Sequence, residues 1–211
     1  MTVGVERSAA GQEKPSLLFR LVSIVEPLDL GAMFPTPQPV EVELGCGDGG
    51  FLMARAQKHP ERNFIGVERL LGRIRKIDRK GRRLGLTNLR GVRLEAGYFV
   101  EYLLPAASVV ALHVYFPDPW PKRRHHRRRL VNDRFPELAR RVLAPDGVVY
   151  LRTDFAEYFA QMTRVFAAHP AFEPAPTPAD LAAELTDFEK EFVAQGKSTH
   201  RAAYRLRSPQ P

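Results

Sequence analysis

The sequence of 211 residues predicts an α/β fold, an open and mainly parallel β-sheet with helices on both faces. Three observations support this prediction. Short β-rich runs alternate with segments of helical spacing, a glycine-rich turn joins the first run to its helix, and the later strand candidates are mostly apolar, as in strands buried on both faces. With 44% hydrophobic residues, the chain is long enough for one sizeable core.

The expected elements follow one another from residue 40. Residues 1–39 are predicted to form an N-terminal leader, loose up to about Lys14 and partly helical over the apolar residues 17–30, and residues 40–211 the folded domain. Proline clusters at residues 35–39 and 170–178 indicate loops. The last strand candidate follows a long insertion and is expected to join the sheet antiparallel. The predicted strands are residues 40–44, 64–67, 92–94, 109–116, 148–151 and 201–206, and the predicted helices are residues 51–58, 70–84, 135–143 and 156–168.

The charge of the chain points to a polyanionic partner. Its formal net charge is +8, and six of the eight residues from Lys122 to Arg129 are Lys or Arg. Such a run repels itself unless a polyanion neutralises it, so Arg123, Arg124 and their neighbours are expected to bind phosphates. The adjacent His125 and His126 have no cluster of acids or thiols beside them, and we expect no metal site.

Cysteine content and hydropathy indicate the compartment. The single cysteine, Cys46, excludes an internal disulfide and fits a reducing environment. The sequence contains neither an apolar run of transmembrane length nor the pattern of a signal peptide at its start. We therefore expect a cytoplasmic protein with no membrane partner.

A glycine-rich loop follows the first predicted strand. Gly45, Gly47 and Gly50 loosely match the dinucleotide-binding pattern, which alone is a weak signal. Glu43 stands two residues before the first glycine, where its carboxylate would repel a pyrophosphate. A ligand with an ammonium or sulfonium group and no phosphate suits that position better, and S-adenosylmethionine carries both cations.

Two further acids follow the next two strands. Glu68 ends the second strand, where a carboxylate can accept hydrogen bonds from ribose hydroxyls, and Glu95 follows the third, near the expected adenine edge. Three acids at three successive strand ends favour one ligand site over three independent solvated side chains.

The next strand leads to Asp118, which lies between two prolines and beside Trp120, the only tryptophan. The prolines restrict the backbone and remove amide donors, which suits a residue that must be held in place. Because the carboxyl ends of parallel strands share one edge of the sheet, Asp118 is expected beside the glycine loop.

With these features, the chain resembles the bacterial-type tRNA (guanine-N7)-methyltransferases, within the Rossmann-like class I methyltransferases. The resemblance runs from about residue 40 to 206 and implies a mainly parallel seven-stranded sheet. It assigns Glu43, Gly45, Gly47, Glu68, Glu95 and Asp118 to an S-adenosylmethionine pocket, and Lys122, Asp154, Thr186, Asp187, Phe188 and Glu189 to the tRNA substrate. Glu95 departs from the Asp or Asn more usual there. The residues that carry the resemblance are Glu43-Leu-Gly-Cys-Gly47, Gly66-Val-Glu68, Pro117-Asp-Pro-Trp-Pro-Lys122, Thr153-Asp154 and Thr186-Asp-Phe-Glu189.

The resemblance implies transfer of a methyl group to N7 of a guanosine in the tRNA variable loop. Because Asp118 follows a central strand beside the cofactor edge, we expect it to be the catalytic residue, and we expect a monomer or homodimer as the working form. Two alternatives remain from other classes. A non-catalytic RNA-binding module explains the basic run but gives Asp118 no role. A nicotinamide-dependent oxidoreductase explains the glycines but neither Glu43 nor the arginines.

Overall fold

The computed structural model describes residues 15–208, so the loose start predicted up to Lys14 lies outside the described residues. The strands are β1 (Leu18–Phe19), β2 (Val40–Leu44), β3 (Asn63–Val67), β4 (Leu89–Val92), β5 (Val109–Tyr115), β6 (Leu143–Thr153), β7 (Phe172–Pro174) and β8 (His200–Leu206). The helices are α1 (Leu30–Met33), α2 (Gly50–Lys58), α3 (Leu71–Leu84), α4 (Ala96–Tyr98), the π-helical turn η1 (Phe99–Leu103), the 3₁₀ helix η2 (Arg123–Arg128), α5 (Phe135–Val142), α6 (Ala156–Ala167), α7 (Ala179–Ala183) and α8 (Asp187–Ala194).

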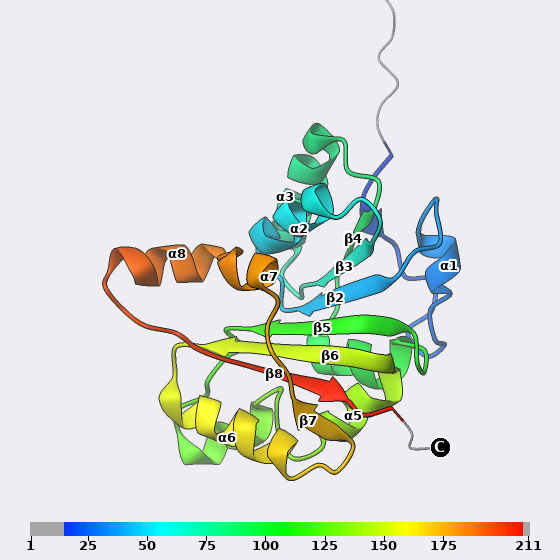
Figure 1. Ribbon diagram of the computed structural model, residues 1–211. Coiled ribbons are helices and arrows are strands. Elements are labelled where there is room, and N and C mark those ends of the chain that lie inside the picture. Colours follow the sequence, from blue (N-terminus) through cyan, green and yellow to red (C-terminus); the bar gives the residue numbers. More distant parts are fainter. Residues whose placement is uncertain (1–14, 209–211) are drawn as a thin grey trace, which may run out of the picture.

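All eight strands of the described chain form one sheet, in the order β1-β4-β3-β2-β5-β6-β8-β7 (Figure 1). Neighbouring strands from β1 to β6 pair in parallel, while β8 pairs antiparallel with both β6 and β7. The predicted fold class is therefore confirmed, including the antiparallel last strand. The sheet has one strand more than the seven expected, because β1 adds to its edge.

The side chains of the sheet alternate between two hydrophobic cores, one on each face. On β3, Phe64 packs into the core under α2 and α3, whereas its neighbour Ile65 packs into the core under α5 and α6. Within the helix predicted for residues 70–84, Ile74 and Ile77 of α3 are fully buried, whereas Leu70 and Leu84 at its two ends are exposed. Figure 1 shows α2 and α3 at one end of the sheet and α5 and α6 at the other.

The segment from residue 17 to 30 differs from the prediction. Leu18 and Phe19 form β1 and pair with Gly91 and Val92 of β4, and helix begins only at Leu30. Consecutive apolar residues lack helical spacing, and they cover an edge strand that would otherwise expose unpaired amides. Residues 15–39 thus pack on the same sheet as the rest of the described chain.

Other boundaries also differ. The strand predicted over residues 148–151 is longer and runs from Leu143 to Thr153. The third predicted strand begins earlier than expected, at Leu89, and ends at Val92. The proline-rich stretch predicted as a loop contains β7, which is an edge strand ending at Pro174, a position where a missing amide donor is tolerated. Within residues 15–208, no helix is long and apolar enough to cross a membrane.

Close packing against β3 gives a test of the fold. A Cβ at Gly66 would lie 2.7 Å from Sγ of Cys46 and 2.8 Å from Cδ1 of Leu52. Gly66→Ala should therefore lower the free energy of unfolding by about 1–3 kcal/mol through overpacking. The matched control is the exposed Gly72 of α3, where a Cβ meets nothing within 4 Å. Gly72→Ala should instead raise stability by up to about 1 kcal/mol. Urea unfolding of both variants measures the difference, and equal effects would contradict this packing.

Candidate active site

A cavity of about 380 Å³ lies where the carboxyl ends of β2, β3, β4 and β5 meet the start of α8. Its position is the usual ligand crevice of an open α/β sheet. The structure brings nine of the predicted site residues together here. They are Glu43, Gly45, Gly47, Glu68, Glu95, Asp118, Thr186, Asp187 and Phe188.

The glycine loop lines one side of the cavity. Gly45 and Gly47 adopt φ angles of 79° and 55°, which side chains rarely tolerate. The amides of Gly45 and Cys46 donate to the carbonyl of Val67, at 2.9 and 3.0 Å, and so fasten the loop to the end of β3. Burial raises the pKa of the Cys46 thiol, as is typical of a cysteine that packs in the interior and does not react.

Glu43 is the most unusual group in the cavity. Its side chain is 4% exposed, and its Oε2 atom is buried without a hydrogen-bond partner. Burial raises the pKa of this carboxyl well above its ordinary value, although the charge of Arg152 opposes the shift. A buried carboxylate with a free oxygen suits a cationic ligand group.

Glu68 and Glu95 hold defined positions through the backbone. Oε1 of Glu68 accepts from the amide of Leu70 at 2.8 Å. The two oxygens of Glu95 accept from the amides of Gly97 and Tyr98, at 2.9 and 2.7 Å, and cap α4. A carboxylate has lone pairs beyond those used here, so both can still accept from ligand hydroxyl or amino groups.

Asp118 lies exposed in a loop with two strained residues. Phe116 and Trp120 both have positive φ angles, 51° and 43°, which are rare for bulky side chains. The ring of Trp120 meets His125 edge-on at 5.8 Å, and the guanidinium of Arg128 lies 5.0 Å from its centre. Trp120 thus packs between members of the basic run while also lining the cavity.

The start of α8 also lines the cavity. Thr186 caps the helix by accepting from the amide of Glu189, whose carboxylate accepts in return from the amide of Thr186. Asp187 lies against Gly50, where a Cβ would come within 2.6 Å of its Oδ2. The C-terminal segment therefore sits directly on the glycine loop.

Glu189 was expected to contact the tRNA substrate, but its side chain is enclosed within the protein. It is 1% exposed, and its oxygens receive Nη1 of Arg152 at 2.7 Å and Nη2 of Arg201 at 2.8 Å. Because these internal contacts occupy the carboxylate, it anchors α8 within the protein and does not face the cavity or the solvent.

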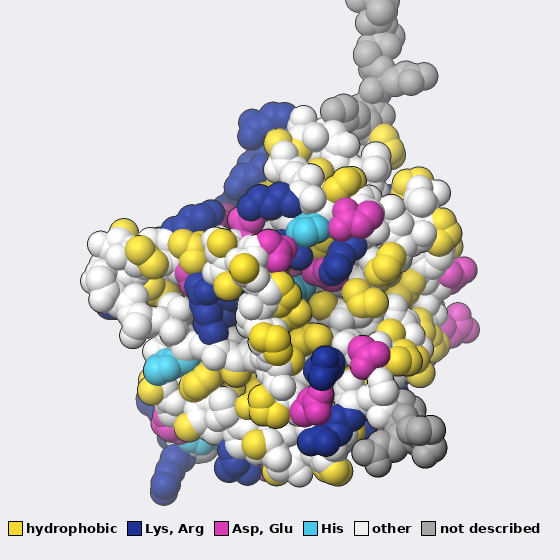
Figure 2. All heavy atoms as spheres, viewed as in Figure 1, with side chains coloured by type: hydrophobic (Ala, Val, Ile, Leu, Met, Phe, Trp, Pro, Cys, Tyr) yellow, Lys and Arg dark blue, Asp and Glu magenta, His cyan; other side chains and the backbone are white. Residues whose placement is uncertain are grey.

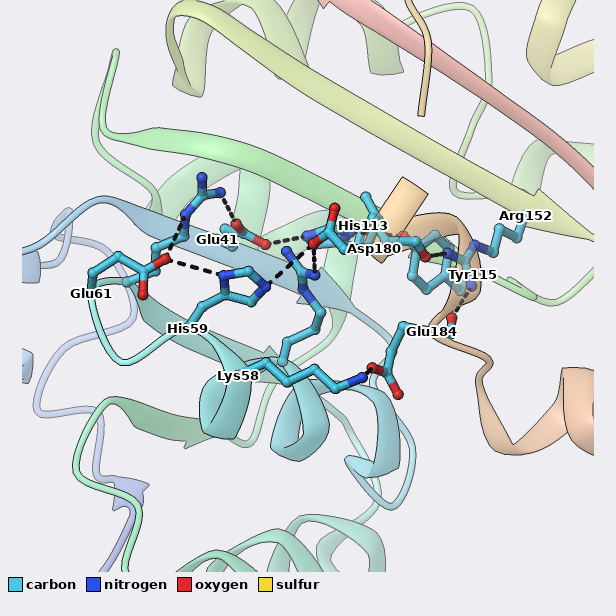
Figure 3. Close-up of polar contacts among 12 residues, drawn as sticks. Glu41, Lys58, His59, Glu61, His113, Tyr115, Arg152, Asp180 and Glu184 are labelled. Atoms are coloured by element: carbon cyan, nitrogen blue, oxygen red, sulfur yellow. Dashed lines mark hydrogen bonds and ion pairs between the residues drawn. The ribbon is translucent and has the colours of Figure 1, made fainter. Parts of the chain in front are cut away.

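A buried polar network supports the floor of the site (Figure 3). His113 on β5 bonds Glu41 through Nε2 and the hydroxyl of Tyr115 through Nδ1, both at 2.9 Å. The Arg152 guanidinium lies 4.3 Å from the ring centre of Tyr115. Burial lowers the pKa of His113 despite its contact with Glu41, which opposes the shift.

Ion pairs also hold α7 against α2 (Figure 3). Arg55 bonds Asp180 at 2.6 Å, His59 lies 3.3 Å from the same carboxylate, and Lys58 pairs with Glu184. These contacts fix the chain just before Thr186, and the ion pairs of Glu189 fix it just after. The start of α8 is therefore held on both sides.

The remaining predicted residues lie outside the cavity lining. Lys122, Arg123 and Arg124 are exposed at the start of η2, and Asp154 is exposed directly after β6. Figure 2 shows further Lys and Arg side chains gathered over α3. Arg129, the last residue of the basic run, is instead 2% exposed. Within residues 15–208, no group of three or more His, Cys, Asp or Glu side chains is placed to hold a metal ion.

Comparison with known proteins identifies the family. A family model described as a putative methyltransferase matches residues 37–202. The tRNA (guanine-N(7)-)-methyltransferase of Syntrophotalea carbinolica is 35% identical over 201 residues, which cover 93% of this chain and 86% of that protein. The protein of the same name from Leifsonia xyli subsp. xyli is 41% identical over 187 residues, covering 84% and 81%. This chain belongs to the tRNA (guanine-N7)-methyltransferase family.

Solved structures share the fold of this tRNA (guanine-N7)-methyltransferase family member. The 16S rRNA methyltransferase KamB superposes with a TM-score of 0.57 at 19% identity, covering 82% of this chain and 89% of that one. The antibiotic-resistance methyltransferase Kmr gives a TM-score of 0.58 at 20% identity, covering 86% and 93%. At these identities the likeness concerns the fold, which is that of class I methyltransferases.

Sequence reasoning missed two arginines of this family member. Arg152, 2% exposed, donates to Glu189 and to the carbonyls of Leu181 and Glu184, at 2.7 to 2.8 Å. A signal was present, because a charged residue at the end of an apolar strand requires a buried partner. Arg129 carried no such signal, since its neighbours are also charged.

The buried carboxyl of Glu43 should make the ligand-free protein less stable than it could be. The pKa of this carboxyl is raised in the folded protein. Below the ordinary value of 4.5 the carboxyl is protonated in both the folded and the unfolded chain, so Glu43→Gln and the original protein should have the same free energy of unfolding. Above that pH the unfolded chain ionises more readily, so the original loses stability and the variant does not. Thermal unfolding at pH 7 should show a higher Tm for the variant, by about 2–4 °C for each kcal/mol gained. The exposed Glu191→Gln is the control, and an equal or lower Tm for Glu43→Gln would contradict the assignment.

Proposed function

We infer that this protein transfers a methyl group from S-adenosylmethionine to N7 of a guanosine in tRNA, forming 7-methylguanosine. The observation that carries the inference is the acid-lined cavity with its buried, unpaired Glu43 carboxylate, in a chain whose relatives of that name align over more than four fifths of both proteins. The variable loop as the site of methylation, the cytoplasm as the compartment, and a monomer or homodimer as the working form belong to the same proposal.

The cavity fits S-adenosylmethionine in its charge. Its lining is acidic on balance, because six carboxylates outnumber the three guanidinium groups of Arg69, Arg73 and Arg128. The carboxylates are those of Glu43, Asp48, Glu68, Glu95, Asp118 and Asp187. This set opposes a pyrophosphate, which counts against a nicotinamide dinucleotide, and favours a ligand with cations and hydroxyls. When bound, S-adenosylmethionine supplies a methyl group on a sulfonium centre. In this proposal Glu43 receives the ammonium group, Glu68 the ribose hydroxyls and Glu95 the adenine edge.

The reaction requires alignment more than proton transfer. N7 of guanine carries a lone pair and no proton, so no side chain needs to act as a general base. Correct alignment of the reacting atoms can contribute on the order of 7–11 kcal/mol to lowering the barrier. Three parts of this chain fix that geometry in the proposal: the capped start of α8 at Thr186, the strained loop at Asp118 and the glycine loop.

Asp118 and Asp154 are the proposed electrostatic partners of the guanine. Positive charge develops on the imidazole ring as N7 forms its new bond, and a nearby carboxylate stabilises it. Asp118 lines the cavity after β5, and Asp154 follows β6, the parallel neighbour of β5. Each can also accept hydrogen bonds from N1 and N2 of the base.

The direct test is methylation of tRNA by the purified protein. We expect 7-methylguanosine in the variable loop, mapped by cleavage at the modified base. Asp118→Ala should lower turnover by about 10²-fold, as loss of one electrostatic partner does, while tRNA affinity stays within about twofold. Near-normal turnover would remove Asp118 from the mechanism.

Calorimetry should show binding of S-adenosylhomocysteine and not of NADH. Binding of NADH alone would overturn the assignment, and binding of neither would favour a non-catalytic RNA-binding module.

The exposed basic residues should bind the RNA backbone. Arg123→Met with Arg124→Met should weaken tRNA binding and reduce the slope of log affinity against log salt by about 2, since two phosphate contacts are lost. The control removes the same charge from Arg140 and Arg205, which pair with Glu137 and Glu173 outside the cavity. Affinity measured from 50 to 200 mM salt distinguishes the two pairs, and identical slopes would contradict a phosphate-binding role.

A further inference from the structure

The basic run from Lys122 to Arg129 does not behave as one surface. Its earlier Lys and Arg members are exposed, but the Arg129 side chain is 1% exposed and turns toward α6. A buried guanidinium is unfavourable unless its donors are satisfied, so its partners indicate what it holds.

Three acceptors and one ring surround the Arg129 guanidinium. Nε donates to the carbonyl of Pro119 at 2.8 Å, Nη1 to Oε1 of Gln161 at 2.6 Å, and Nη2 to Oε1 of Glu157 at 3.3 Å. Its centre lies 4.8 Å from that of the Tyr158 ring. Three of these partners belong to α6, and the fourth is the residue after Asp118.

The loop that carries Asp118 needs such a support. Pro117, Pro119 and Pro121 have no amide donors, so the loop can form few backbone hydrogen bonds of its own. Phe116 and Trp120, one at each end, have left-handed backbones that persist only where the surroundings impose them. The amide of Phe116 donates to the carbonyl of Arg152 at 2.8 Å and fixes the first end. Arg129 fixes the other end through Pro119.

The chain after Arg129 is fastened to the same helix. The amide of Val131 donates to the hydroxyl of Tyr158 at 2.9 Å, and its carbonyl accepts from Nε2 of Gln161 at 3.0 Å. The arginine therefore joins a rigid part of the fold to the Asp118 loop.

We propose that Arg129 is a positioning residue that holds Asp118 in its working geometry, and not a phosphate contact like its exposed neighbours. The proposal rests on the proposed function for its effect on turnover. Arg129 also couples the position of the proposed RNA-binding helix η2 to that of the Asp118 loop. It directly follows η2 in the chain and hydrogen-bonds the loop that precedes η2.

The protein carries a natural probe of this contact. Trp120 is the only tryptophan of the chain, so tryptophan emission, excited at the red edge of the absorption band where the six tyrosines do not absorb, reports on this loop alone. Arg129→Met should shift the Trp120 emission to longer wavelength and increase its quenching by acrylamide, because the loop loosens. Arg129→Lys should do the same, because an ammonium keeps the charge but cannot reach three separated acceptors as the planar fork does.

Turnover and tRNA binding separate positioning from phosphate contact. Both Arg129 variants should lower kcat by at least about 10-fold, since a misplacement near 1 Å is enough for a large loss, while KM for tRNA and the salt slope stay close to the original. The exposed Arg127→Met is the matched control from the same run. It should weaken tRNA binding and reduce the salt slope by about 1, without moving the Trp120 emission.

Two results would overturn the proposal. One is an Arg129→Lys variant with the original emission and kcat, which would show that charge alone suffices. The other is an Arg129→Met variant that repeats the behaviour of Arg127→Met. Should Arg129→Met not fold, Gln161→Met keeps the arginine and removes one acceptor, and an unchanged emission and kcat there would equally refute it. The fluorescence result does not depend on turnover, so it stands even if the original protein methylates no tRNA, an outcome that would refute the proposed function instead.

Discussion

Between β2 and β5 the chain changes the direction in which it builds the sheet, and this reversal determines where a ligand can bind. From β2 the chain adds β3 and β4 on one side and then crosses to add β5 and β6 on the other. The loops after β2 and β5 therefore lead away from each other and leave a crevice between them. For this reason Glu43 and Asp118 line one cavity, although they lie 75 residues apart in the sequence, about a third of the chain.

The site contains a buried polar group and strained backbone conformations that lower the stability of the fold. Glu43 is buried with an oxygen unpaired, and Phe116 and Trp120 have strained backbones on either side of Asp118. Such features cost stability and persist only when stronger contacts determine the surrounding structure. Here those contacts are two buried guanidinium groups. Arg152 ties the start of α8 to β6, and Arg129 ties the Asp118 loop to α6.

The sequence determined the site better than it determined the edges of the fold. Acids after successive parallel strands must lie at one edge, so Glu43, Glu68, Glu95 and Asp118 could be placed together without coordinates. A two-residue strand such as β1 has no periodicity to detect, and it forms because β4 offers an open edge. Which arginine of a charged run turns inward was equally beyond reach. The answer depends on Tyr158 and Gln161, about thirty residues further along the chain.

The contrast between an acidic cavity and a basic surface beside it suits a ligand that is itself divided in charge. In the proposed function, the exposed arginines of η2 attract the phosphates of the RNA and the six carboxylates of the cavity repel them, so the backbone stays outside while a base can enter. Methylation at N7 turns a neutral base into a cation. On the proposed function, the same carboxylates that repel phosphate stabilise the charge that forms. A catalytic base would add nothing to this arrangement, because the reacting nitrogen has no proton to lose.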